Sequence, residues 1–212
     1  ICNDEALSLL DSLYSESEDW TGAARTLERR LEATVSASVR LGLLTRLAEL
    51  EANKLERWVA ATSRFEEVLV SRPDDLDVLR HLSSLYEITQ QWDSLVETLV
   101  SRARLVDSTE EFCALTMAAA EAAQSRVKDV DRAAELASSV LQREPNNVFA
   151  LRLRARLLSD SESTAEALEA WDSLLPQLTE SSERIEALMM LGGLQLRLGN
   201  SARALSAFRD TL

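Results

Sequence analysis

The feature that most constrains this chain is a set of similar residues that recur 72 positions apart. Most of the matched positions hold large apolar or aromatic side chains, which are typical of buried surfaces. A fixed period indicates structural units stacked along the chain, each burying its apolar surface against its neighbours. The matches pair Leu10 with Leu82, Tyr14 with Tyr86, Trp20 with Trp92, Ala23 with Leu95, Leu27 with Leu99 and Pro73 with Pro145.

Residues 76–107 show what one such unit contains. Leu79, Leu82 and Tyr86 recur at the spacing that places them on one face of a helix. A polar turn follows, and Trp92 opens a second segment with the same kind of spacing. Ala, Leu, Glu and Arg dominate the chain, which has only 5 Gly and 3 Pro and no alternating run typical of a strand. We therefore predict an all-α fold of antiparallel helical hairpins.

About six hairpins, or about twelve helices, fit the chain. In the second and fourth hairpins the segment that joins the two apolar stripes is longer, at residues 49–57 and 124–129. We expect the helices of these hairpins to gain about one turn. We expect residues 1–212 to form a single solenoid domain. Both ends lack the polar cap that a solenoid needs, which suggests an excerpt of a longer chain. The predicted hairpins cover approximately residues 4–34, 38–73, 76–107, 109–145, 148–180 and 182–212.

The residues that should pack between the helices can be read from the same pattern. In most second helices a small residue is followed one turn later by a large one, as in Ala61 and Phe65. We place Leu10 in the buried stripe of the first hairpin. We interpret the four tryptophans as core residues of the second helices, since repeat spacing keeps them from converging on one ligand: Trp20, Trp58, Trp92 and Trp171.

These hairpins resemble tetratricopeptide repeats, as a divergent array of the bacterial type. That family has the pattern Trp-x2-Leu-Gly-x2-Tyr, then Ala-x3-Phe, then Pro. The last hairpin is closest to it, with Leu188, Leu191, Gly192, Gly199, Ala204 and Phe208. The resemblance implies an α-solenoid of stacked hairpins wound into a right-handed superhelix, whose function is to bind other proteins.

The sequence offers no set of residues suited to catalysis, to a metal or to a cofactor. His81 is the only histidine and has no nucleophile at a useful spacing, so we expect a structural or solvent-facing role. Cys113 fits a half-buried small apolar position. Gly192 and Gly193 are not followed by the Lys-Ser/Thr of a phosphate-binding loop. We expect neither an enzyme nor a cofactor.

Charge and cysteine content narrow the choice of partners and compartment. The formal net charge of -13 would repel a nucleic-acid backbone, so nucleic acid is not an expected partner. No apolar run approaches the length of a membrane span, so membrane insertion is not expected. Cys2 and Cys113 lie far apart in unlike contexts, which favours a reducing compartment, and we expect a cytoplasmic location.

In tetratricopeptide-repeat proteins the first helices of the hairpins line a concave groove that holds a peptide or a helix. The arginines of the corresponding surface here could bind a carboxylate-bearing partner; the alternative is a solvated face with ordinary ion pairs between neighbouring residues. The Lys and Asn set of the chaperone-binding members is absent. The resemblance implies that the groove holds Arg46, Glu49, Asp77, Arg80, Ser84, Glu87, Glu110, Met117, Glu121, Phe149, Arg152 and Arg156.

Three functions remain open at this point. The first is a protein-interaction scaffold whose partner is another protein or a peptide. The second is a structural spacer, or a segment that self-associates through its uncapped ends. The third is an RNA-binding protein of the pentatricopeptide kind, which has similar hairpins but is disfavoured by the acidic charge.

Overall fold

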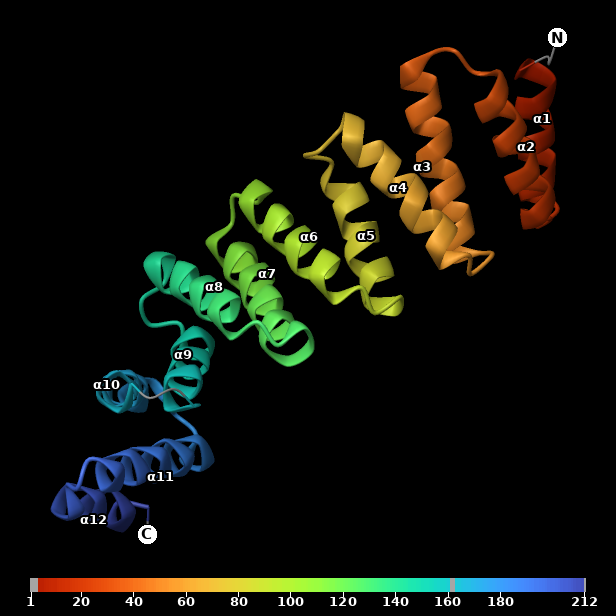
Figure 1. The fold of residues 1–212 in the computed structure, drawn as a ribbon. Helices are drawn as coiled ribbons and strands as arrows, with labels where there is room; N and C mark the ends of the chain where they lie inside the picture. Colours follow the sequence, from red (N-terminus) through yellow and green to blue (C-terminus); the bar gives the residue numbers. More distant parts are fainter. Residues whose placement is uncertain (1–3, 161–162, 212) are drawn as a thin grey trace. The chain divides into compact units, whose positions relative to one another are not determined.

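The computed structural model describes residues 4–160 and 163–211. Within these ranges the chain forms twelve α-helices and no strand, and consecutive helices pair as antiparallel hairpins (Figure 1). The predicted all-α fold with about six hairpins and twelve helices is confirmed. The helices cluster into two compact units, Ile1–Leu105 and Val106–Leu212, called unit 1 and unit 2 here. The assignment of residues 1–212 to one domain stays a prediction.

Unit 1 contains three hairpins, in which each helix packs against the next one along the chain. The hairpins pair α1 with α2, α3 with α4, and α5 with α6. The bounds are α1 (Asp4–Glu16), α2 (Trp20–Ala33), α3 (Ala37–Asn53), α4 (Trp58–Ser71), α5 (Leu76–Ile88) and α6 (Trp92–Leu105).

Unit 2 repeats this arrangement with three further hairpins, in which α7 pairs with α8, α9 with α10, and α11 with α12. A π-helical turn, Ala123–Val127, extends α7, and a short 3-10 helix, Leu175–Gln177, follows α10. The bounds are α7 (Thr109–Ala122), α8 (Val130–Arg143), α9 (Val148–Asp160), α10 (Thr164–Leu174), α11 (Ser181–Arg197) and α12 (Ser201–Arg209).

The 72-residue repeat is present in the backbone as well as in the sequence. Among the residues that the structure describes, four other than glycine adopt left-handed conformations, and they form two pairs at this offset: Glu18 with Gln90, at φ 57° each, and Glu56 with Lys128, at φ 53° and 68°. Each of them lies in the turn between the two helices of a hairpin. Left-handed residues other than glycine are uncommon and costly, so their recurrence indicates that equivalent turns have the same geometry.

The two longer hairpins accommodate their extra residues differently from each other. In the second hairpin only the first helix is longer: α3 has 17 residues, against 13 in α1 and in α5, while α4 keeps 14. In the fourth hairpin the π-helical turn Ala123–Val127 takes up the insertion. A π turn adds a residue to a helix without interrupting it, which explains why no helix breaker appears in the sequence. The expected lengthening is therefore right for α3, whereas α8 is not lengthened.

The predicted core is largely the observed one, with two corrections. Ala61 and Phe65 are fully buried, as the small–large pattern predicts. Trp58, placed in the core by its position in the repeat, is 39% exposed; it begins α4 as Trp20 and Trp92 begin α2 and α6, and none of the three is fully buried at the start of its helix. Leu10 is 40% exposed, since the buried face of α1 holds Leu7 and Asp11 instead. Of the other tryptophans, only Trp171 is fully buried.

Glycine allows the closest contacts between helices in two hairpins. A Cβ atom added to Gly192 in α11 would lie 2.5 Å from the ring of Phe208 in α12. A Cβ atom added to Gly22 in α2 would lie 2.7 Å from the ring of Tyr14 in α1. Both distances are far below van der Waals contact, so the ring occupies the space that a side chain would need.

Substitution of Gly192 by Ala should therefore destabilise unit 2. We expect Gly192→Ala to lower the free energy of unfolding by about 1–3 kcal/mol, because the Phe208 ring must move. Gly193 is the matched control: no atom lies within 4 Å of its added Cβ, so Gly193→Ala should stabilise α11 by about 0.5–1 kcal/mol. Urea denaturation of both variants measures the difference. Equal effects would show that the two helices do not approach each other as described.

Candidate functional site

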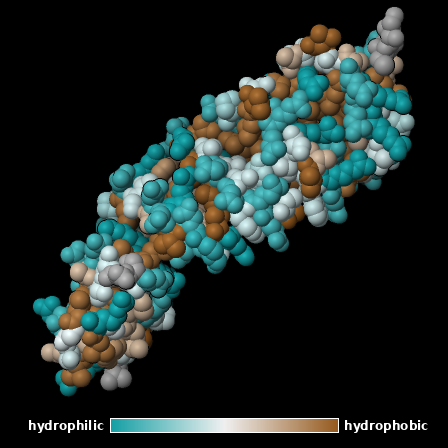
Figure 2. Space-filling view, viewed as in Figure 1, coloured by the Kyte–Doolittle hydropathy of each residue, from teal (hydrophilic) through white to brown (hydrophobic). Residues whose placement is uncertain are grey.

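The first helices of the hairpins carry all the residues that the resemblance assigned to a binding groove. These helices are α1, α3 and α5 in unit 1, and α7, α9 and α11 in unit 2, and we call the surface they present in each unit the first-helix face. Figure 2 shows that hydrophobic residues on the side it presents form separate groups among hydrophilic ones. On that side, hydropathy alone does not mark a site.

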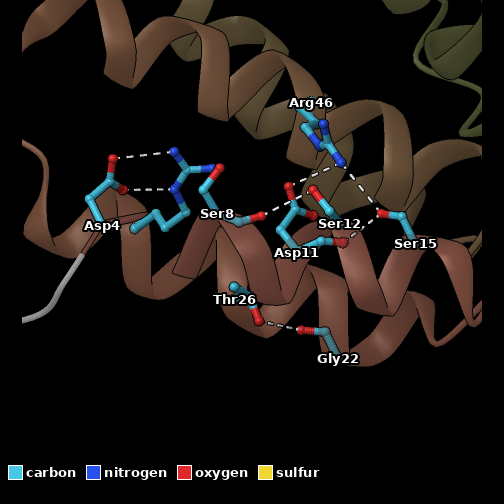
Figure 3. Close-up of polar contacts among 9 residues, drawn as sticks. Asp4, Ser8, Asp11, Ser12, Ser15, Gly22, Thr26 and Arg46 are labelled. Carbon is cyan, nitrogen blue, oxygen red and sulfur yellow. Dashed lines mark hydrogen bonds and ion pairs between the residues drawn. The ribbon is translucent and has the colours of Figure 1, made fainter. Parts of the chain in front are cut away.

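In unit 1, the predicted groove residue Arg46 contacts the neighbouring first helix. Its Nη2 atom lies 3.0 Å from Oδ2 of Asp11, a carboxylate that is only 3% exposed, and 3.4 Å from Oγ of Ser15 (Figure 3). Arg46 thus joins α3 to α1. Removing the cation from a buried carboxylate strongly destabilises a folded protein. Arg46 therefore stabilises unit 1 by neutralising Asp11.

His81 and Glu49 form a second contact between first helices of unit 1. Nε2 of His81 in α5 lies 3.8 Å from Oε1 of Glu49 in α3. The His81 ring also stacks on the ring of Phe65, with centroids 5.0 Å apart and planes 5° from parallel. The structural role expected of the only histidine agrees with this position.

The remaining predicted residues of unit 1 lie on the exposed side of α5. Nη1 of Arg80 donates a hydrogen bond to Oδ1 of Asp77 at 2.9 Å, within the same helix. The hydroxyl of Ser84 donates to the carbonyl of Arg80 at 3.4 Å, and Glu87 is exposed. This part of the surface is a solvated helix face with local pairs.

The two predicted arginines of unit 2 also link first helices. Nη2 of Arg152 lies 2.6 Å from Oε1 of Glu183, and Nη2 of Arg156 lies 2.5 Å from Oε1 of Glu186. Both pairs join α9 to α11. All four arginines considered as anchors for a carboxylate-bearing partner therefore already hold a carboxylate of the chain itself, three of them on a neighbouring first helix and Arg80 within its own helix.

A hollow of about 510 Å³ lies between α7, the start of α9 and the connection that leads into α9. The apolar part of its wall includes Cys113, which is buried, Met117, which is half-buried, and Phe149, which is 69% exposed. We call it the α7–α9 hollow. Its wall consists of Thr109, Glu110, Cys113, Ala114, Met117, Glu144, Asn147 and Phe149. It brings together Glu110, Met117 and Phe149 of the predicted groove residues, whereas Glu121 lies outside it.

The two carboxylates of the α7–α9 hollow have no basic residue beside them in its wall. Glu144 accepts a hydrogen bond from the side-chain amide of Asn147 at 2.7 Å, a neutral partner that leaves its charge in place. Glu110 is exposed in the first turn of α7. Arg143, outside the wall, has its guanidinium carbon 3.6 Å from the centre of the Phe112 ring, and its charge acts on the Cys113 thiol.

The surroundings of Cys113 disfavour its thiolate form. Burial raises the pKa of its thiol, the hydrogen bond to Glu144 and the charge of Glu144 raise it further, and the charge of Arg143 offsets only part of this rise. A reactive cysteine needs the opposite environment, one that stabilises the thiolate. Cys113 therefore serves as an apolar part of the wall. Among the described residues, no cluster of His, Cys, Asp and Glu could hold a metal ion.

Some residues of this hollow could be recognised from the sequence alone. Glu110, Cys113 and Met117 follow one another at the spacing that places them on one face of α7. Glu144 and Asn147 were missed because they lie in the connection between two hairpins, where helical periodicity gives no information.

No helix of the described part of the chain has the length and apolar composition needed to cross a bilayer.

The arrangement of the helices is similar to that in several solved structures. MamA has a TM-score of 0.54 and 15% identity, with coverage of 77% of this chain and 91% of MamA. The fold is that of a tetratricopeptide-repeat array. YrrB, described as a TPR protein with an unusual peptide-binding site, has a TM-score of 0.53 and 13% identity, over 89% of this chain and 92% of YrrB.

PilF of Pseudomonas aeruginosa has a TM-score of 0.50 and 16% identity, over 96% of this chain and 88% of PilF. At such low identities these likenesses establish the TPR-like fold alone. No known family profile matches the sequence, and no curated protein matches it. The function must therefore be inferred from the residues of this chain.

The role of the arginines as links between first helices can be tested with a charge swap. Arg152→Glu places two carboxylates together and should lower the free energy of unfolding by about 1 kcal/mol, whereas Arg152→Glu combined with Glu183→Arg should restore most of the loss. Arg80→Glu is the control and should have little effect, since Arg80 pairs only with exposed Asp77 in the helices described here. A double variant no more stable than Arg152→Glu alone would contradict this role.

Proposed function

We propose that this chain is a non-catalytic scaffold that binds a peptide or a helix of another protein on its first-helix face. The α7–α9 hollow is the centre of the contact. The observation that carries the proposal is Phe149, a large apolar side chain with 69% of its surface exposed beside a hollow lined by Met117. Aromatic and Met side chains are enriched in the centres of protein interfaces, where they contribute most of the binding energy.

The other predicted groove residues take supporting roles in this proposal. Arg152 and Arg156 hold α9 against α11 and so fix the position of Phe149 relative to its surroundings. In unit 1, Arg46 links α3 to α1 and Glu49 links α3 to α5. The exposed residues of α5 are available for peripheral contacts: Asp77, Arg80, Ser84 and Glu87. Peripheral charged contacts influence the association rate more than the affinity.

The structural-spacer alternative is favoured by a different observation. Leu9 and Leu13 on α1 are 63% and 59% exposed, so apolar surface is available there as well. A self-associating segment would use this surface and would leave the α7–α9 hollow empty.

Photo-crosslinking in the native cell separates the two functions. A photoreactive amino acid at position 117 of the full protein should give a crosslink to a different protein, and the same amino acid at the exposed position Ser138 of α8 should not. Phe149→Ala should then weaken binding of the captured protein about tenfold or more. Equal crosslinking from both positions, or crosslinks only to further copies of this chain, would contradict the proposal.

A further inference from the structure

The charges around the α7–α9 hollow carry an inference about the partner. Resting on the proposed function, we propose that the segment bound there is cationic and amphipathic: a large apolar side chain enters the hollow, and Lys or Arg residues on either side of it meet Glu110 and Glu144.

The hollow is suited to one large apolar anchor. Its volume of about 510 Å³ is within the range of ligand-binding pockets, although it is open to solvent along one side. Cys113 and Ala114 are small, and Met117 is unbranched and adaptable, so the wall can adjust to an aromatic or a branched aliphatic side chain. Phe149 at the edge can cover the inserted side chain and exclude water from it.

The charges select against an acidic segment. Glu110 and Glu144 are both exposed, and no residue of the wall is basic. The arginines further along α9 do not compensate for these charges, because Arg152 and Arg156 are paired with Glu183 and Glu186. Arg143 lies over the Phe112 ring and is not part of the wall, although its charge reaches Cys113. The charged residues of the wall are both glutamates, so a ligand carboxylate there would lie beside like charge, whereas an ammonium or a guanidinium group could pair with either glutamate.

The same charges disfavour the other occupants of an apolar hollow. A second copy of this chain carries a net charge of -13 and would be repelled at long range. An anionic membrane surface would be repelled for the same reason. A cationic segment is attracted both by the two glutamates and by the overall charge, which should increase its association rate at low ionic strength.

Three synthetic peptides of equal length test the inference by fluorescence anisotropy with the full protein. The first holds one Phe flanked by Lys on both sides, the second replaces each Lys by Glu, and the third keeps Lys but replaces Phe by Ser. The first should bind, and the other two should bind about tenfold more weakly or worse. Equal binding of the Phe and Ser peptides would overturn the inference, because it would reduce the effect to unspecific charge attraction.

Matched variants locate the binding on the protein. Glu110→Gln with Glu144→Gln should weaken binding of the first peptide about threefold to tenfold and reduce its salt dependence. Glu135→Gln with Glu169→Gln removes the same charge from exposed positions of the second helices and should leave the affinity unchanged. Equal losses in the two double variants would overturn the inference.

The inference and the proposed function can fail separately. If position 117 crosslinks to a partner whose contact segment is acidic or uncharged, the scaffold function stands and the cationic chemistry is wrong. If the Lys-Phe peptide binds at the hollow but position 117 captures no other protein in the cell, the hollow has the stated chemistry while its use as a binding site for a partner protein is contradicted.

Discussion

The whole structure depends on the close contact between the two helices of each hairpin. A small residue on one helix leaves space for a large residue on the other, as at Gly192 with Phe208 and at Gly22 with Tyr14. Each hairpin is too small to bury both of its faces, so it gains stability by stacking on the next one. This packing fixes which side of each first helix faces outward, and hence which residues can meet a partner.

Polar contacts add a second level of order on the first-helix face. In unit 1 Arg46 joins α3 to α1, and in unit 2 Arg152 and Arg156 join α9 to α11. These arginines stand out in an acidic sequence, but each is already paired with a carboxylate of the same chain. What remains on the first-helix face of unit 2 is an apolar hollow with two carboxylates, and this is the basis of the proposed partner chemistry.

The fold could be predicted from the sequence because each hairpin repeats the same packing solution, so one register supports the next. The prediction was wrong for Trp58: it matches the repeat, but at the first residue of α4 it is 39% exposed, and the equivalent Trp20 and Trp92 are only half-buried. The π-helical turn Ala123–Val127 could not be predicted, because its residues are ordinary helix formers. The partners of Arg46 and Arg152 lie on neighbouring hairpins, and the edge formed by Glu144 lies in a connection, so periodicity revealed neither.

The central claim is the register that buries one stripe of each helix, and the most direct measurement is the free energy of unfolding after truncation of Phe65. Phe65 is fully buried between helices, whereas Val59 on the same helix is 71% exposed. Phe65→Ala should lower the free energy of unfolding, measured with urea, by about 3–5 kcal/mol. Val59→Ala should change it by less than about 0.5 kcal/mol. A Phe65→Ala variant as stable as the parent chain would contradict the register and, with it, the position of every residue assigned to the binding surface.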